Sequence, residues 1–99
     1  MPQELTYVQQ RDRKNLEEIR AFLMKLPPSC TFFIQSIEET TTTLTRLGYV
    51  RDLHLFFRFL TTEIAEFGDK PVVSLTDDDL KYVTGQHVAL YAQFLSLYI

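Results

Sequence analysis

Large apolar side chains recur at a helical period through the middle of this chain. Steps of four, three, one, three, four and three residues define a single stripe: Tyr49, Leu53, Phe56, Phe57, Leu60, Ile64 and Phe67. A helix repeats about every 3.6 residues and a strand every two, so these steps favour a helix. We expect about seven turns, beginning in the threonine run at residues 40–43 and ending at Gly68. Gly48 lies inside this helix, where it would let another molecule approach closely.

Two helices are expected upstream of this one. The first spans residues 6–25 and has one apolar face, formed by Leu16, Ile19, Leu23 and Leu26. Pro27 and Pro28 end it, because proline has no amide hydrogen and disfavours helical backbone at the residue before it. The second helix is short and is capped by Ser29, with apolar side chains at compatible spacing: Phe32, Phe33 and Ile37.

Two further elements are expected downstream. Thr76 and Asp79 have the spacing of a capping box and predict a short helical turn through Tyr82. A last helix begins after Thr84 and is apolar on two faces, one with Val88, Tyr91, Leu95 and Tyr98, the other with Leu90, Phe94 and Leu97. A helix that is apolar around most of its circumference is usually buried between two partners. We therefore expect the second face to contact another helix, either one that follows residue 99 or one from a second copy.

These patterns predict an all-α fold, a small bundle of four to five helices that lacks its last helix. Residues 1–99 form one partial domain. Cys30, the single cysteine, excludes an internal disulfide and is expected to be a small buried side chain in a reducing cytosol. No apolar run approaches the roughly 18 residues of a membrane span, and residues 1–5 lack a signal-peptide pattern, so a cytoplasmic location is expected. The histidines have no metal-ligand spacing, and neither a metal nor a cofactor is expected.

The distribution of charge bears on nucleic-acid binding. A net charge of -3 argues against it, because basic residues supply most of the affinity for phosphates. The charge is segregated, however. Residues 40–62 hold three arginines against one aspartate, a local +2, and residues 63–80 hold six acids against one lysine, a local -5. The segment that begins the long helix is therefore mildly basic.

The start of the long helix has the chemistry of a phosphate site. A helix N-terminus presents unpaired amides and a partial positive charge. Thr42 or Thr43 would cap the helix, and the remaining hydroxyls, including that of Thr45, would turn to phosphate oxygens. Arg46 and Arg51 would supply positive charge. These five residues are the candidate DNA contacts, and the alternative is an ordinary threonine cap followed by arginines on a solvated face.

Two other polar groups receive weaker assignments. Gln86 and His87, in the first turn of the last helix, are a candidate secondary DNA contact, with an ordinary first turn as the alternative. Arg11 and Lys14 alternate with acids along the first helix, which is typical of a solvated helix face.

The long helix also carries a signature that resembles tyrosine recombinases. Its residues run Thr42-x-x-Thr45-Arg46-x-x-Tyr49-x-x-Asp52-Leu53-x-x-Phe56-Phe57-x-Phe59-Leu60. This order is similar to the S/T-x-x-T-x-x-x-Y-x-x-D-L-x-x-F pattern in the N-terminal core-binding domain of that family. The resemblance extends upstream to residues 26–38, as in integrases of Gram-positive bacteria, and downstream to Val83-Thr84-x-x-His87-Val88-x-x-Tyr91-x-x-Phe94-Leu95. His87 departs from the acid that those relatives usually carry.

The resemblance implies a SAM-like core-binding domain that forms one half of a clamp around double-stranded DNA. Such a domain positions a recombination site, while a separate catalytic domain of the same protein performs DNA integration and recombination within a multimer. The catalytic domain carries arginines, a lysine, a His-x-x-Arg motif and a tyrosine nucleophile. Residues 1–99 hold no such set, so this region is not expected to be an enzyme. The principal alternative is a helical protein-interaction module that mediates oligomerisation without touching DNA.

Overall fold

The computed structural model describes residues 6–68 and 70–97 and confirms the all-α fold class, with no strand in these ranges. The elements follow one another as α1 (Tyr7–Leu23), α2 (Pro28–Ser36), α3 (Thr43–Glu63), the 3-10 turns η1 (Ala65–Phe67) and η2 (Val72–Ser74), α4 (Asp77–Leu80) and α5 (Gly85–Ser96). Tyr98, expected on an apolar face of the last helix, lies outside the described residues.

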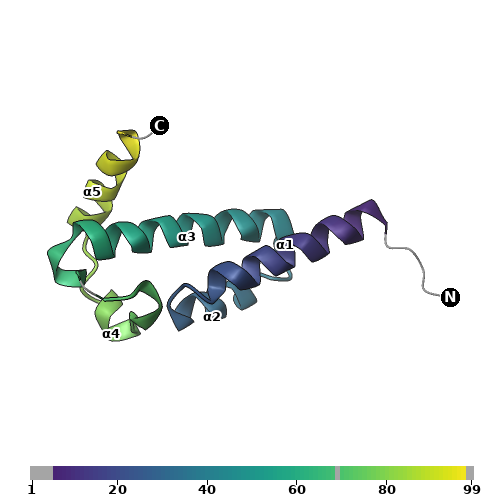
Figure 1. Cartoon of the computed structure of the whole chain (residues 1–99), viewed down its shortest axis with the longest axis horizontal. Helices are drawn as coiled ribbons and strands as arrows, with labels where there is room; N and C mark the ends of the chain where they lie inside the picture. Colours follow the sequence, from purple (N-terminus) through teal and green to yellow (C-terminus); the bar gives the residue numbers. More distant parts are fainter. Residues whose placement is uncertain (1–5, 69, 98–99) are drawn as a thin grey trace.

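Helix α3 runs through the centre of the molecule, and the other elements pack around it (Figure 1). Helix α1 lies beside it and runs in the same direction, because Asn15 contacts Thr43 at the start of α3 and Phe22 contacts His54 further along. The short helix α2 carries the chain back from the end of α1 to the start of α3. Helix α5 leaves the far end of α3 and points away from α1 and α2 (Figure 1). The result is an elongated molecule of 56 × 30 × 23 Å.

Two helix boundaries differ from the expected ones. Helix α2 begins at Pro28 with Pro27 as its cap, so the prediction of a Ser29 cap is wrong. Proline suits the first helical turn because its φ is already helical and its missing amide hydrogen would have no partner there. Helix α3 ends at Glu63 rather than at Gly68, because Ile64 adopts extended backbone with φ −111° and ψ 115°. The chain then turns through η1.

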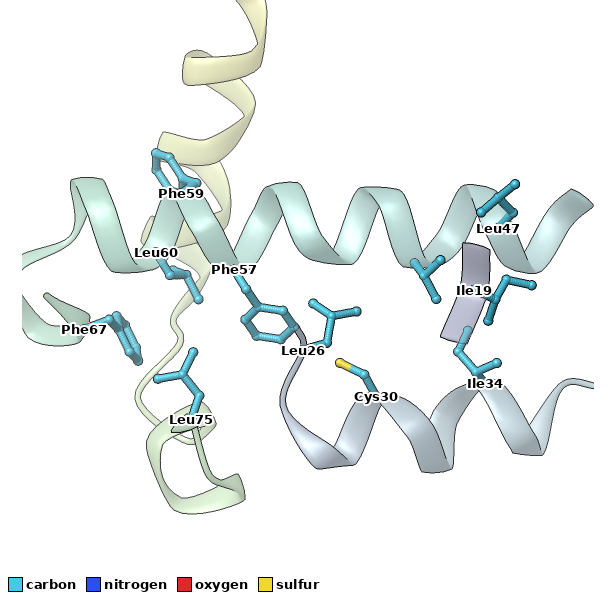
Figure 2. Packing of buried hydrophobic residues seen from close by; sticks show 11 residues of the cluster. Ile19, Leu26, Cys30, Ile34, Leu47, Phe57, Phe59, Leu60, Phe67 and Leu75 are labelled. Atoms are coloured by element: carbon cyan, nitrogen blue, oxygen red, sulfur yellow. The ribbon is translucent and has the colours of Figure 1, made fainter. Parts of the chain in front are cut away.

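The hydrophobic core follows α3 from end to end (Figure 2). Its buried members are Ile19, Leu26, Cys30, Ile34, Leu47, Val50, Phe57, Phe59, Leu60, Phe67 and Leu75. Side chains of α1 and α2 surround Leu47 near the start of α3, and side chains from η1 and the connector before α4 approach Leu60 near its end (Figure 2). The buried side chains of α1, α2, η1 and the connector before α4 thus pack along the same long helix.

The buried stripe differs from the predicted one near its start. Tyr49 is 43% exposed, whereas Leu47 and Val50 are buried. In α1, likewise, Leu16 is 38% exposed while its neighbour Asn15 is buried. The two helices meet through faces rotated from those that apolar periodicity alone selects. The rotation makes room for polar contacts between α1 and α3.

Substitution of Gly48 tests whether α3 requires a glycine on its open face. A Cβ placed there meets no atom within 4 Å beyond the helix's own backbone, and alanine restricts the unfolded chain more than glycine does. We expect Gly48→Ala to raise the free energy of unfolding by about 0.5–1 kcal/mol in urea denaturation. Gly68→Ala is the control, because its Cβ would lie only 3.3 Å from the carbonyl oxygen of Ala65. Equal effects of the two substitutions would contradict an open face at Gly48.

Candidate nucleic-acid interface

Thr42 caps α3, as one of the two alternatives predicted. Its hydroxyl accepts a hydrogen bond from the backbone amide of Thr45 at 3.2 Å and donates one to the Thr45 hydroxyl at 3.0 Å. Both residues are exposed. Since the Thr45 hydroxyl is the acceptor in this pair, its own proton remains available to a phosphate oxygen.

Thr43, the next residue, is turned toward α1. Its hydroxyl donates to the Asp12 carboxylate at 2.8 Å and accepts from the side-chain amide of Asn15 at 3.2 Å. Asn15 is buried, so these bonds satisfy a polar group that would otherwise be without a partner inside the protein. Thr43 therefore serves the packing of α1 on α3, in contrast to its expected role as a DNA contact.

Arg46 is buried and also serves the fold. The residue is 7% exposed, and its Nη1 donates to the carbonyl oxygens of Glu38 at 2.9 Å and Thr41 at 2.7 Å. These carbonyls follow the end of α2, which has no basic residue in its last turn. The carbonyl end of a helix attracts a cation. The guanidinium that was expected to meet DNA instead joins the end of α2 to the start of α3.

A groove between α1 and the first half of α3 gathers exposed cations. It has a volume of about 460 Å³ and is lined by Tyr7, Gln10, Arg11, Lys14, Asn15, Glu18, Leu44, Leu47 and Arg51. We call it the basic groove. Arg51 was expected at a ligand site, whereas Arg11 and Lys14 were assigned to a solvated helix face. Their spacing with Glu18 does place them on one face of α1, but only the packing shows that this face borders α3.

The charge of the basic groove differs from that of the opposite side of α1. The three cations of the groove and Glu18 sum to +2. A hollow on the other side of α1 is lined by Arg13 and Arg20 together with Asp12 and Glu17, which sum to zero. Long-range attraction of an anion therefore favours the groove.

The start of α5 is held by Thr84 and His87. The Thr84 hydroxyl accepts from the amide of His87 at 3.3 Å, and Nδ1 of His87 accepts from the amide of Thr84 at 3.0 Å. Nε2 of the same ring lies 2.9 Å from the carboxylate of Glu66. His87 is 8% exposed and thus fills the capping position that an acid usually occupies, rather than facing a ligand. Gln86 is the exposed residue of the pair.

A second groove lies between α2, α3 and α5 and is largely apolar. Its volume is about 600 Å³, and its lining is Phe33, Tyr49, Asp52, Leu53, Leu55, Phe56, Tyr91 and Leu95. We call it the apolar groove. The rings of Phe56 and Tyr91 meet edge to face with centroids 5.0 Å apart, which ties α5 to α3. Burial raises the pKa of Tyr91, and the negative charge of Asp52 raises it further.

Only part of the α5 face that was expected to contact another helix is exposed. Leu90 and Leu97 are 39% and 80% exposed. Phe94, by contrast, packs against Phe59 of α3 with ring centroids 5.1 Å apart. The two leucines remain available to a partner, and Phe94 belongs to the contact that holds α5 in place.

Within residues 6–68 and 70–97, no three His, Cys, Asp or Glu side chains gather as a metal site would require. No helix in the same ranges is long and apolar enough to cross a membrane. Cys30 is a small buried side chain, as predicted, and burial raises the pKa of its thiol to about 11. It is therefore protonated and unreactive near neutral pH.

Comparisons of the chain with protein-family models, curated proteins and solved structures found no match. The resemblance to tyrosine recombinases accordingly rests on the order and spacing of the residues in α2, α3 and α5. The geometry and charge of the two grooves provide a separate basis for assigning a function.

The buried guanidinium of Arg46 makes a direct prediction about stability. Arg46→Met keeps an unbranched side chain but removes every donor, leaving the carbonyls of Glu38 and Thr41 without their partner. We expect the free energy of unfolding in urea to fall by about 2–3 kcal/mol. Arg58→Met, at an exposed position of the same helix, should change it by less than about 0.5 kcal/mol. Similar values for the two variants would refute a structural role for Arg46.

Proposed function

We propose that this chain binds double-stranded DNA as the core-binding domain of a tyrosine-type integrase, and that the basic groove contacts the DNA phosphates. The observation that carries the proposal is the convergence of Arg11, Lys14 and Arg51 from two helices on one groove. The groove borders the half of α3 that begins with the Thr42 cap. Residues 42–60 resemble the recombinase signature, and for that reason we propose duplex DNA as the ligand.

The groove suits contacts to the DNA backbone rather than to base edges. Lysine and arginine bind phosphate oxygens, and an exposed threonine hydroxyl at a helix start adds a short donor. Such contacts position a protein on the duplex without reading its sequence. Of the DNA contacts predicted from the sequence, Thr42, Thr45 and Arg51 are exposed in the first half of α3, and Gln86 is exposed at the start of α5, away from this groove.

The number of cations limits how tightly the isolated domain binds. Three cations neutralise about three phosphates, which corresponds to a slope of about −2.7 in log affinity against log salt concentration. A complete recombinase needs more contacts than this. In our proposal the domain therefore holds and orients the recombination site, and a separate catalytic domain supplies further affinity and performs strand exchange.

The test is removal of two groove cations. Lys14→Gln/Arg51→Gln should weaken binding to a labelled DNA duplex by roughly 100-fold at about 50 mM salt, because each lost phosphate contact is worth about tenfold there. The salt slope should become shallower by about 1.8. Both quantities are measured by fluorescence anisotropy titration.

The matched control removes the same charge from the other side of α1. Arg13→Gln/Arg20→Gln changes net charge equally but alters the hollow whose charges sum to zero. Its affinity should stay close to that of the wild type. If the two double variants bind DNA equally well, the basic groove is not the contact surface; if the wild type does not bind DNA even at low salt, DNA binding itself is refuted.

The apolar groove favours a second function, self-association. Helix α5 contains no Asp, Glu, Lys or Arg, and its exposed Val88 lies on the same face as Tyr91 and Leu95 of the groove; Phe33, Tyr49 and Leu55 in the groove lining are also exposed. A continuous apolar surface of this kind is typical of protein contacts. A symmetric dimer would bury the same surface on both copies, which is consistent with an integrase domain that assembles as a multimer on DNA.

A charge placed in the apolar groove tests self-association. We expect the sedimentation-equilibrium mass of the wild type to rise above 11.6 kDa with concentration, and that of Leu55→Glu to remain monomeric, because a dimer would bury the new carboxylate. Leu16→Glu introduces the same charge at a similarly exposed leucine of α1 and should associate like the wild type. A wild-type protein that stays monomeric at its highest soluble concentration would exclude this function.

A further inference from the structure

In the described part of the chain, the basic groove is lined by one carboxylate, which faces Arg51. Oε2 of Glu18 lies 3.1 Å from Nη2 of Arg51. Among the described residues, Glu18 is the only acid that lines the groove. A guanidinium binds carboxylate and phosphate oxygens through the same donors. The Glu18 carboxylate thus occupies the place that a phosphate oxygen would take.

We infer that Glu18 is an internal competitor of DNA, which holds Arg51 in the free protein and lowers the affinity of the basic groove for phosphate. The inference rests on the proposed DNA-binding function and adds a means of limiting its strength. Arg51 exchanges one anionic partner for another when DNA binds. Glu18 then remains in the groove as an unpaired negative charge beside the phosphates.

The exposure of the pair allows this exchange. The side chains of Arg51 and Glu18 are 54% and 39% exposed, so water solvates both groups whether or not they are in contact. Exposed ion pairs contribute little to stability. A phosphate can therefore displace the carboxylate without disturbing the packing of α1 on α3, which depends on buried groups such as Ile19 and Leu47.

Asp12 is another acid of α1 that contacts α3, and it has a different role. Its carboxylate accepts the hydroxyl proton of Thr43 at 2.8 Å and lies 3.7 Å from Arg11. It is a member of the network that includes the buried Asn15. Asp12 therefore contributes to the contact between the helices, and Glu18 is the acid whose removal leaves that network intact.

The test compares two glutamates that are neighbours in α1. Glu18→Gln should bind a labelled DNA duplex about five- to tenfold more tightly than the wild type at about 50 mM salt, because Arg51 no longer has to leave a carboxylate before it contacts a phosphate. Glu17→Gln makes the same change in net charge, but Glu17 pairs with Arg13 on the other side of α1 at 3.8 Å. Its affinity should change less than twofold.

A double-mutant cycle separates competition for Arg51 from simple repulsion of the phosphates. In an Arg51→Gln background the gain from Glu18→Gln should fall below twofold, since no guanidinium is left to release. Thermal unfolding of each variant verifies that the fold is retained. A gain that persists without Arg51, or equal gains for Glu17→Gln and Glu18→Gln, would overturn the inference while leaving DNA binding intact. No binding by the wild type or by Glu18→Gln would overturn both.

Discussion

The packing of the other elements along α3 is the constraint on which this molecule depends. Helix α1 packs along one side of it, Phe33 of α2 meets Tyr49, the 3-10 turns pack against it, and α5 rests on Phe59 near its end. Val50 and Leu60 have no exposed surface. The face of α3 that its neighbours leave uncovered includes Arg51, which borders the basic groove, and Leu55, one turn further on, which borders the apolar groove. The positions of both candidate sites therefore follow from how the core is buried.

Polar groups at the start of α3 are shared between the fold and the surface. Thr43 bonds to α1, and Arg46 bonds to carbonyls beyond the end of α2. A buried guanidinium is tolerable only where such partners neutralise its desolvation. These two anchors fix the first turn of α3 relative to both earlier helices. Thr45 and Arg51 are consequently presented on a rigid element, and a rigid surface loses less entropy when it binds. Thr43 and Arg46 thus position Thr45 and Arg51, which are proposed to contact the ligand.

Local signals predicted much of the fold. The Thr42 cap, the capping box of Thr76 with Asp79 and the stop at the two prolines each depend on residues within one helical turn, so the sequence shows them directly. The burial of Arg46 and the meeting of Arg51 with Arg11 and Lys14 depend on contacts between distant segments. Neither periodicity nor charge counting reveals whether α1 lies parallel to α3, or which of its faces borders the groove. For that reason two predicted DNA contacts, Arg46 and His87, are buried, and two residues assigned to ordinary solvated surface, Arg11 and Lys14, line the candidate site.

One lone pair of His87 orients the start of α5. Because the backbone amide of Thr84 donates to Nδ1, that nitrogen carries no proton, and the neutral ring is the Nε2–H tautomer with its proton directed at Glu66. An aspartate in this place would accept the same hydrogen bond but would have no second nitrogen to direct at Glu66. The single ring of His87 therefore links the first turn of α5 to η1, the turn that follows α3, and the direction in which α5 leaves the bundle depends on both ends of that ring.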